Sequence, residues 1–417
     1  MRILAVLALV AAACGDTTTT SAPDMATPGG VTLDPPPAGQ GTQLKMAFTV
    51  GAGVEFERCQ FFTLAAGTNI NRQQVQYTPG SHHVLVYGTD YKSIPTVDQN
   101  GNKLQFDASQ PFDCSDGATA LFTVTSILGG SQNDTDKDVN VLPPGVAIKI
   151  PAGGVVLLNA HYINATTQAL DAEVRINLFT IPDSAVTTEA GIIFFYNPFI
   201  DIGPMSTSSA RMSCPITKDI TLLNAQSHMH KRGVNYLANL VDKTDTTLEM
   251  LYANKSWGNV PIEQYSGGKM LKAGTSIDFH CDYASSENRT IIQGPTTKDE
   301  MCMFIGAYYP RDTNLENCSA PGYDQDSAAT WYGVGKATCG DTVTCVQASK
   351  DAASYYSCIV NSCTSQGPLV SNLLHCIGRA QAAGGPCASC QGAACTTCLE
   401  SACGSDLGAC LGAPACN

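Results

Sequence analysis

Residues 277–283 read IDFHCDY, and this stretch indicates the fold class because apolar and polar side chains alternate along it. Side chains of a β-strand point to opposite faces in turn, so such alternation is typical of a strand with one buried face. His280 is out of phase with the apolar positions, which places it on the solvated face without an assigned role. Other strand-like runs, such as QLKMAFTV at 43–50, are separated by turn signals such as PPG at 143–145. Many short strands at this spacing predict an all-β sandwich.

The strand-like runs fall into two sets, which predict two tandem antiparallel β-sandwich domains. The first covers residues 44–183 and the second covers residues 184–330, with the boundary near the sequence PDS at 182–184. A chain of 417 residues also exceeds the size at which one hydrophobic core usually stops growing. More than one domain is therefore expected.

Residues 338–417 differ in composition from the rest of the chain, because they contain twelve of the nineteen cysteines and few large apolar side chains. Such a segment cannot bury much core, so we predict a small, disulfide-rich, partly helical module with short helices within 348–360 and 370–383. Two CxxC pairs at 387–390 and 395–398 are too close together for a typical structural zinc site, so disulfides are favoured over zinc. The sequence suggests an accessory or surface-interaction role for this module.

The first residues predict export. Arg2 is followed by the apolar run ILAVLALV and by AAAC, which together are typical of a signal peptide over residues 1–14. The small residues before Cys14 resemble a bacterial lipobox, so we predict a lipid-modified Cys14, with an ordinary signal peptide as the alternative. Residues 15–43, rich in Thr, Pro and Gly, form the predicted flexible linker. The expected location is the periplasm or cell surface of a bacterium, with the lipid anchor as the only membrane attachment.

The charge of the chain excludes some classes of partner. Only 14% of residues are charged and the net charge is −13, which argues against binding to nucleic acid or to anionic membrane surfaces. The acidity leaves a neutral or cationic small-molecule substrate open. After Cys14 is set aside, eighteen cysteines remain, six before residue 319 and twelve after it. Both even numbers fit disulfides in an oxidising compartment.

His228 and His230 are the strongest candidate metal ligands, because side chains at positions i and i+2 of a strand share one face. The simpler alternative is a pair of surface histidines. A cupin site is a second alternative, but cupins place a Glu a few residues later and this chain reads KRGVN at 231–235. The sequence after the histidine pair therefore departs from the cupin pattern.

Four further candidate ligands stand elsewhere in the chain. His82 and His83 are adjacent, so both can bind one metal only if the strand bends there, and Gly80 makes a bulge plausible. His161 alone would be a structural histidine and Met301 alone a core methionine. A thioether beside imidazoles, however, favours Cu(I), whereas zinc sites use thiolate, imidazole and carboxylate.

Taken in order, these motifs resemble those of the copper type II, ascorbate-dependent monooxygenases. The matching stretches are SHHVL at 81–85, NAHY at 159–162, SHMHKRG at 227–233, DEMC at 299–302 and YYP at 308–310. The resemblance covers roughly residues 40–325 and implies jelly-roll-like sandwiches with two separate copper ions. It implies an electron-transfer copper on His82, His83 and His161, and an oxygen-binding, catalytic copper on His228, His230 and Met301. It also implies the disulfides Cys59–Cys114, Cys214–Cys318 and Cys281–Cys302.

The function implied by the resemblance is hydroxylation of a substrate C–H bond, with O2 and a one-electron donor such as ascorbate. The substrate would be a small organic molecule or a surface-exposed group. Peptide amidation is not expected, because Gln226, Met303 and Ile305 stand where the peptide-amidating enzymes bind a peptide carboxylate. The alternative is a non-catalytic copper-binding or cell-surface interaction protein of the same fold.

Overall fold

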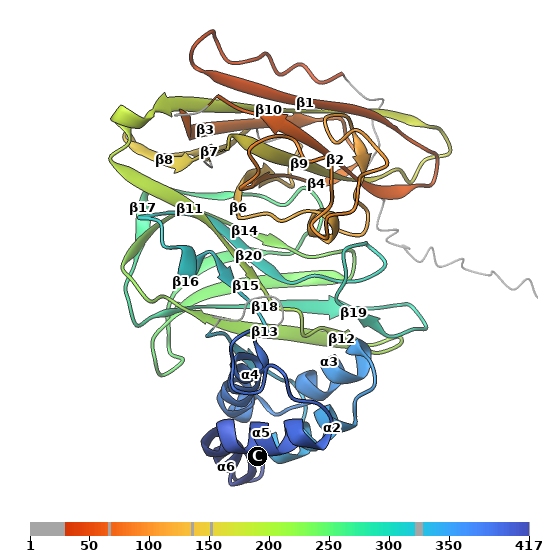
Figure 1. Cartoon of the computed structure of the whole chain (residues 1–417), viewed down its shortest axis with the longest axis vertical. Coiled ribbons are helices and arrows are strands. Elements are labelled where there is room, and N and C mark those ends of the chain that lie inside the picture. The colour runs from red at the N-terminus through yellow and green to blue at the C-terminus, as the bar shows by residue number, and fades with distance from the viewer. Residues whose placement is uncertain (1–29, 66–67, 135–136, 151–152, 322–327, 417) are drawn as a thin grey trace, which may run out of the picture.

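The computed structural model describes residues 30–65, 68–134, 137–150, 153–321 and 328–416. Three parts follow one another along the long axis of the molecule (Figure 1). An N-terminal β-half is drawn in red to yellow, a C-terminal β-half in green, and a helical module in blue. The all-β prediction with a helical C-terminal module is confirmed.

Two sheets form the N-terminal half. Its strands are β1 Gly41–Val50, β2 Glu55–Thr63, β3 Thr68–Tyr77, β4 Ser81–Gly88, β5 Phe112–Asp113, β6 Ser126–Ser131, β7 Asp138–Val141, β8 Val146–Lys149, β9 Val155–Ile163 and β10 Leu170–Pro182, with the short helix α1 Ala118–Leu121. One sheet has the order β5-β2-β9-β4-β6, and the other begins β1-β10-β3-β8. Their facing side chains, such as Met46, Val84, Leu158 and Ile176, share one buried core.

The C-terminal half repeats this arrangement. After the 3-10 turn η1 Asp183–Ala185, its strands are β11 Thr188–Tyr196, β12 Asp201–Ile202, β13 Thr207–Pro215, β14 Ile220–His228, β15 Gly233–Val241, β16 Thr247–Asn254, β17 Glu263–Leu271, β18 Ser276–Ala284, β19 Ile291–Ile292, β20 Met303–Tyr309, β21 Asn317–Cys318 and β22 Thr330–Tyr332, with the 3-10 turn η2 Thr313–Leu315. One sheet has the order β16-β15-β18-β13-β22. In β18 the alternation is as predicted, because Ile277, Phe279 and Cys281 are fully buried and His280 is partly exposed.

The two halves share a sheet and a core. Strand β8 pairs in parallel with β11, so the larger sheet continues through the molecule in the order β1-β10-β3-β8-β11-β20-β14-β17. Ile192, Met303 and Ile305 of the C-terminal half pack into the core of the N-terminal half. The predicted pair of antiparallel sandwiches did not include this parallel pairing, because a pairing between distant strands leaves no local sequence pattern. The joint fixes how the two halves face each other.

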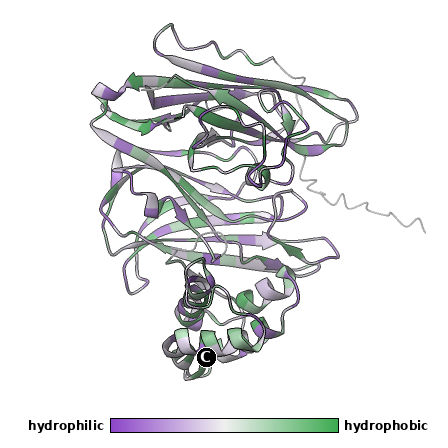
Figure 2. Cartoon of the chain, in the orientation of Figure 1, coloured by the Kyte–Doolittle hydropathy of each residue, from purple (hydrophilic) through white to green (hydrophobic). Residues whose placement is uncertain are grey.

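The C-terminal module is helical and packs against the C-terminal half. Its elements are α2 Cys339–Ala348, α3 Ala352–Val360, η3 Thr364–Gln366, α4 Gly367–Gln381, α5 Ala393–Ala402 and α6 Gly404–Leu411. Phe199 of the β-half stacks edge-on against Trp331, and it also contacts Tyr355 and Tyr356 of α3. The apolar side chains of the module therefore continue the core of the β-half rather than forming a detached domain. Hydrophobic and hydrophilic stretches along the strands and helices can be followed in Figure 2.

Nine disulfides cross-link the described part of the chain. Three lie in the β-halves, Cys59–Cys114, Cys214–Cys318 and Cys281–Cys302, and these are the pairs that the family resemblance implied. Six lie in the module, namely Cys339–Cys410, Cys345–Cys358, Cys363–Cys416, Cys376–Cys403, Cys387–Cys398 and Cys390–Cys395. The four cysteines of the two CxxC pairs thus form disulfides with one another, which agrees with the prediction of disulfides rather than a zinc site. This number of disulfides indicates an exported protein.

The predicted signal peptide and Cys14 lie outside the described residues. Within the predicted linker, residues 30–40 contain no helix or strand, and β1 begins at Gly41. None of the helices in the described ranges combines the length and the apolar character that crossing a membrane requires.

Candidate metal centre

A bulge in β4 brings both adjacent histidines to the same region. The register between β4 and β9 shifts between Ser81 and His83, so that His82 is the extra residue and His83 lies opposite His161. The hydroxyl of Ser81 donates to the backbone carbonyls of His83 and His161, at 3.0 and 3.1 Å, and so holds the bulge. Gly80 precedes it with a positive φ of 108°. The geometric difficulty posed by adjacent histidines is solved by the bend that the sequence suggested.

The second pair of histidines lies at a turn held by a buried carboxylate. Strand β14 ends at His228, and the backbone N–H groups of His230 and Arg232 donate to Glu300 at 2.8 and 2.7 Å. Burial raises the pKa of Glu300 to about 7, although these hydrogen bonds act in the opposite direction and lower it. Met229 points away into the core, and a Cβ at Gly233 would lie 2.7 Å from its sulfur. The glycine is therefore required for the turn to close.

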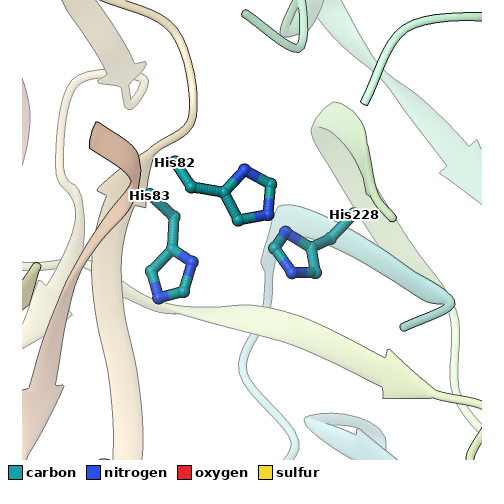
Figure 3. Close-up of side chains that lie close together, drawn as sticks. All are labelled: His82, His83 and His228. Atoms are coloured by element: carbon teal, nitrogen blue, oxygen red, sulfur yellow. The ribbon is translucent and has the colours of Figure 1, made fainter. Parts of the chain in front are cut away.

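The five histidines form one group, here called the histidine cluster (His82, His83, His161, His228 and His230), at the joint between the halves. The ring of His82 lies 4.8 Å from that of His228 and 5.2 Å from that of His230, measured between centroids. The rings of His83 and His161 are 5.2 Å apart. Figure 3 shows His82 and His83 facing His228 across the joint. The two ligand sets implied by the resemblance thus lie side by side in this structure.

Hydrogen bonds leave one nitrogen of each anchored ring available to a metal. Nε2 of His83 lies 3.2 Å from the side-chain oxygen Oδ1 of Asn159, and Nε2 of His161 lies 3.0 Å from the carboxylate oxygen Oε1 of Glu55. Both acceptors require the ring Nε2–H to donate, so the lone pair is on Nδ1, and Nδ1 of both rings is buried without a partner among the described residues.

The histidines of the C-terminal half are anchored through the opposite nitrogen. Nδ1 of His228 lies 2.5 Å from the side-chain oxygen Oε1 of Gln132, and Nδ1 of His230 lies 3.1 Å from the backbone oxygen of Asp299. Nε2 of His230 is buried without a partner among the described residues, as is Nε2 of His82. The lone pairs of these rings are therefore aimed away from their anchors, as in metal-ligating histidines.

The electrostatics of the cluster also suit a metal ion. Burial lowers the pKa of His82, His83 and His228 well below its usual value, and burial likewise lowers that of His230 to about 3. The rings are accordingly neutral, which is the form that binds a metal. Ligand atoms of His82, His83 and His228 lie within 4.8 Å of one another, and those of Glu57, His83 and His161 do so as well. Imidazoles with an adjacent thioether fit copper.

Met301 is held beside the cluster by its neighbours. Cys302 forms its disulfide with Cys281, and the hydroxyl of Tyr283 donates to the backbone oxygen of Met301 at 2.8 Å. Its partly exposed side chain lines the same cavity as His83 and His228. At least one proposed ligand of each copper ion therefore lies in the wall of this cavity.

The cavity has a volume of about 710 Å³ and lies between the halves. Its wall combines apolar groups such as Phe194, Met303 and Ile305 with the amides of Gln132, Asn140 and Gln226. Charged residues in the described wall are the acids Glu57, Asp116 and Glu316, and no Lys or Arg is among them. Gln226, Met303 and Ile305, which the sequence singled out, all face this space.

Two polar contacts across the joint involve anchors of the cluster. Gln132, from the N-terminal half, donates to the backbone oxygen of Ser227 at 2.8 Å while its own oxygen binds His228. Glu55 accepts from the backbone N–H and the hydroxyl of Thr297, both at 2.7 Å, while it binds His161. Partial burial raises the pKa of Glu55, but the hydrogen bonds from His161 and Thr297 outweigh this effect and lower that pKa to about 2.

Sequence reasoning missed Glu55, Glu57 and Gln132. The two acids alternate along β2 with the period of a strand, which was visible, but their place opposite His161 depends on the pairing of β2 with β9. The remaining histidines have no place in the cluster. His375 bonds to the backbone oxygen of Ala329 at 2.7 Å in the module, and His280 lies on the outer face of β18.

Residues 188–329 match the family model of the copper type II ascorbate-dependent monooxygenase C-terminal domain. This segment contains His228, His230 and Met301, and the match supports the family, whose members are copper monooxygenases. No curated protein matches the chain.

Two solved structures show a weak resemblance to the chain. A crystal structure of peptide-N(4)-(N-acetyl-β-D-glucosaminyl) asparagine amidase has 10% identity and a TM-score of 0.26, over 64% of this chain and 97% of that one. The infectious bursal disease virus VP2 subviral particle has 10% identity and a TM-score of 0.14, over 64% and 71%. Scores this low carry no argument about function.

Replacing Gln132 with Leu tests whether the anchor of His228 comes from the opposite half. The change keeps a similar volume, but it leaves the Nδ1–H of His228 and the carbonyl of Ser227 buried without a partner. We expect Cu(I) affinity to fall by roughly 10- to 100-fold and stability to fall by about 1–3 kcal/mol.

Competition titration with a chromophoric Cu(I) chelator and urea denaturation measure the two effects. Gln74→Leu, at a partly exposed glutamine whose amide contacts Asp138, is the matched control. Wild-type Cu(I) affinity in Gln132→Leu would show that His228 needs no such anchor.

Proposed function

We propose that the protein is an exported copper-dependent monooxygenase that hydroxylates a C–H bond of an organic substrate. O2 is the oxidant and ascorbate, or a similar one-electron donor, is the reductant. One oxygen atom enters the C–H bond, and the other leaves as water with electrons and protons supplied by the donor and solvent. The observation that supports this most directly is the Met301 thioether in one cavity wall with His83 and His228, which belong to a histidine cluster that has unpartnered buried nitrogens. The match over residues 188–329 points the same way.

The ligand sets follow the resemblance. His82, His83 and His161 would hold an electron-transfer copper, and His228, His230 and Met301 would hold the oxygen-binding copper. Bound copper would supply one-electron transfer and activation of O2. The chain's own residues orient the ligands in advance. Gln132 and the carbonyl of Asp299 fix the imidazoles of His228 and His230, and Tyr283 fixes the backbone of Met301. A thioether favours the reduced form of copper, which is the form that reacts with O2.

Met301→Ile tests the oxygen site without knowledge of the substrate. Because only the thioether is lost, we expect Cu(I) affinity at one site to fall on the order of tenfold or more and ascorbate-supported O2 uptake to fall with it. Met212→Ile, at a fully buried core methionine of β13, is the matched control.

Chelator competition and an oxygen electrode give the two readouts. Unchanged Cu(I) binding and uptake in Met301→Ile would remove Met301 from the site. Tight copper binding by the wild type without any ascorbate-dependent uptake would favour the non-catalytic copper-binding alternative.

The cavity wall indicates the charge of the substrate. No Lys or Arg in the described wall could form an ion pair with a carboxylate or phosphate, so the wall suits a neutral or cationic molecule with an apolar body. The amides of Asn140 and Gln226 offer hydrogen bonds to neutral polar groups.

A substrate panel checks this charge preference. Compounds that share one apolar body and carry a hydroxyl, an ammonium or a carboxylate group would be compared by product formation in the presence of copper and ascorbate. We expect kcat/KM for the carboxylate to be lower by at least about tenfold, which corresponds to about 1.4 kcal/mol. A carboxylate that reacts best would contradict the assignment of this cavity as the substrate site.

Attachment to a membrane through a lipid on Cys14 is part of the proposal, and it rests on the sequence pattern of residues 1–14. Metabolic labelling with a fatty acid should mark the wild type and not Cys14→Ser. Equal labelling of both would place any lipid elsewhere.

A further inference from the structure

Glu57 is a buried carboxyl group without a cationic partner. Only 7% of the residue is exposed, and it lies in the cavity wall near the histidine cluster. The adjacent Arg58 extends to Asp113 instead, at 2.5 Å, and no Lys or Arg in the described ranges forms an ion pair with Glu57. A buried carboxylate in such a position is costly unless a cation or several hydrogen bonds stabilise it. The carboxyl group of Glu57 is thus buried without a Lys or Arg to neutralise it among the described residues.

The position of Glu57 follows from strand pairing. In the register of β2 with β9, Glu57 lies directly opposite His161, and β9 in turn places His161 opposite His83 of β4. Three adjacent strands of one sheet therefore present a carboxylate and two imidazoles side by side. Their ligand atoms lie within 4.8 Å of one another, a spacing that one metal ion can bridge.

Asn159 connects two of these three groups. Its side-chain nitrogen donates to Oε2 of Glu57 at 2.7 Å, and its oxygen therefore faces Nε2 of His83 at 3.2 Å. The same amide thus orients the carboxylate and fixes the tautomer of His83. Glu55 orients the ring of His161 by accepting a hydrogen bond from its Nε2.

These anchors leave a complete set of free donor atoms. Nδ1 of His83 and Nδ1 of His161 are both buried without a partner among the described residues. A carboxylate has about four acceptor positions, so the bond from Asn159 leaves Glu57 able to bind a cation. Ligands anchored on one side and open on the other are the arrangement found around metal ions.

We propose that Glu57 is an additional metal ligand, which joins the three histidines at the copper site of the N-terminal half. This inference rests on the copper binding in the proposed function, and it adds one ligand to the set that the resemblance implied. The ring of His82 lies 5.6 Å from that of His83 and 5.4 Å from that of His161, so all three imidazoles remain part of this site.

A carboxylate ligand changes the redox properties of the site. An anionic oxygen donor stabilises Cu(II) more than Cu(I), whereas neutral imidazoles discriminate less between the two. A site with a carboxylate ligand beside its imidazoles therefore has a lower reduction potential than a site with imidazoles alone. Such a site is a stronger electron donor to its neighbour.

The test isolates the N-terminal site in the full-length chain by combining His228→Ala with Met301→Ile. In this background we expect one Cu(II) per chain. Adding Glu57→Gln, which keeps an oxygen acceptor for Asn159, should lower Cu(II) affinity by roughly 10- to 100-fold. The Cu(I) affinity should change less, and the Cu(II) electron paramagnetic resonance spectrum should change. Asp171→Asn, at an exposed carboxyl on β10, is the matched control for loss of one negative charge.

A second measurement does not depend on the folding of the Glu57 variant. X-ray absorption of the Cu(II)-loaded background protein reports its ligand shell, and imidazole nitrogens together with a carboxylate oxygen are expected at this site. A shell without a carboxylate oxygen, or an unchanged Cu(II) affinity and spectrum in Glu57→Gln, would overturn the assignment of Glu57 and leave the proposed function standing. Absence of copper binding in the wild type would instead overturn the proposed function itself.

Discussion

Five histidines are buried at the joint between two β-halves, and a metal ligand there must have a ring with a fixed direction. Four of the rings meet this requirement through a hydrogen bond from one nitrogen to an acceptor of the protein. The acceptors are oxygen atoms, so the bonded nitrogen carries the proton and the other keeps its lone pair. The energetic cost of burying the rings is offset only in part within the protein. The unpartnered nitrogens account for the remaining cost, and a metal ion would satisfy them.

The anchors make the two halves depend on each other. Gln132 of the N-terminal half holds His228, while Glu55 holds His161 and binds the Thr297 segment of the C-terminal half. The parallel pairing of β8 with β11 and the shared apolar core keep these contacts in register. The C-terminal half alone lacks the anchor of His228, and Glu55, the anchor of His161 in the N-terminal half, is itself held by Thr297 of the other half. In this structure, ligand geometry is therefore a property of the joint.

Much of the fold and part of the site were predictable from local sequence. The alternation in 277–283 identified a strand with one buried face, and Gly80 before His82 suggested the bulge that the structure has. The nearness of the two histidine sets was not predictable, because it depends on pairing between strands far apart in the chain. Glu57 escaped notice for the same reason. A carboxylate on a strand is ordinary until the register places it opposite a histidine.

The segment around Met301 shows why the helical module belongs to the same structural unit. A thioether is a weak ligand, so it contributes to binding only if its backbone is already held in place. The Cys281–Cys302 disulfide and the hydroxyl of Tyr283 hold this segment from within the β-half. Gln293, which precedes it and lines the cavity, bonds to Tyr196 on one side and to Tyr356 of the module at 3.3 Å on the other. The module thus contacts the cavity wall as well as extending the core, which gives the cysteine-rich segment a structural role beside any surface interaction.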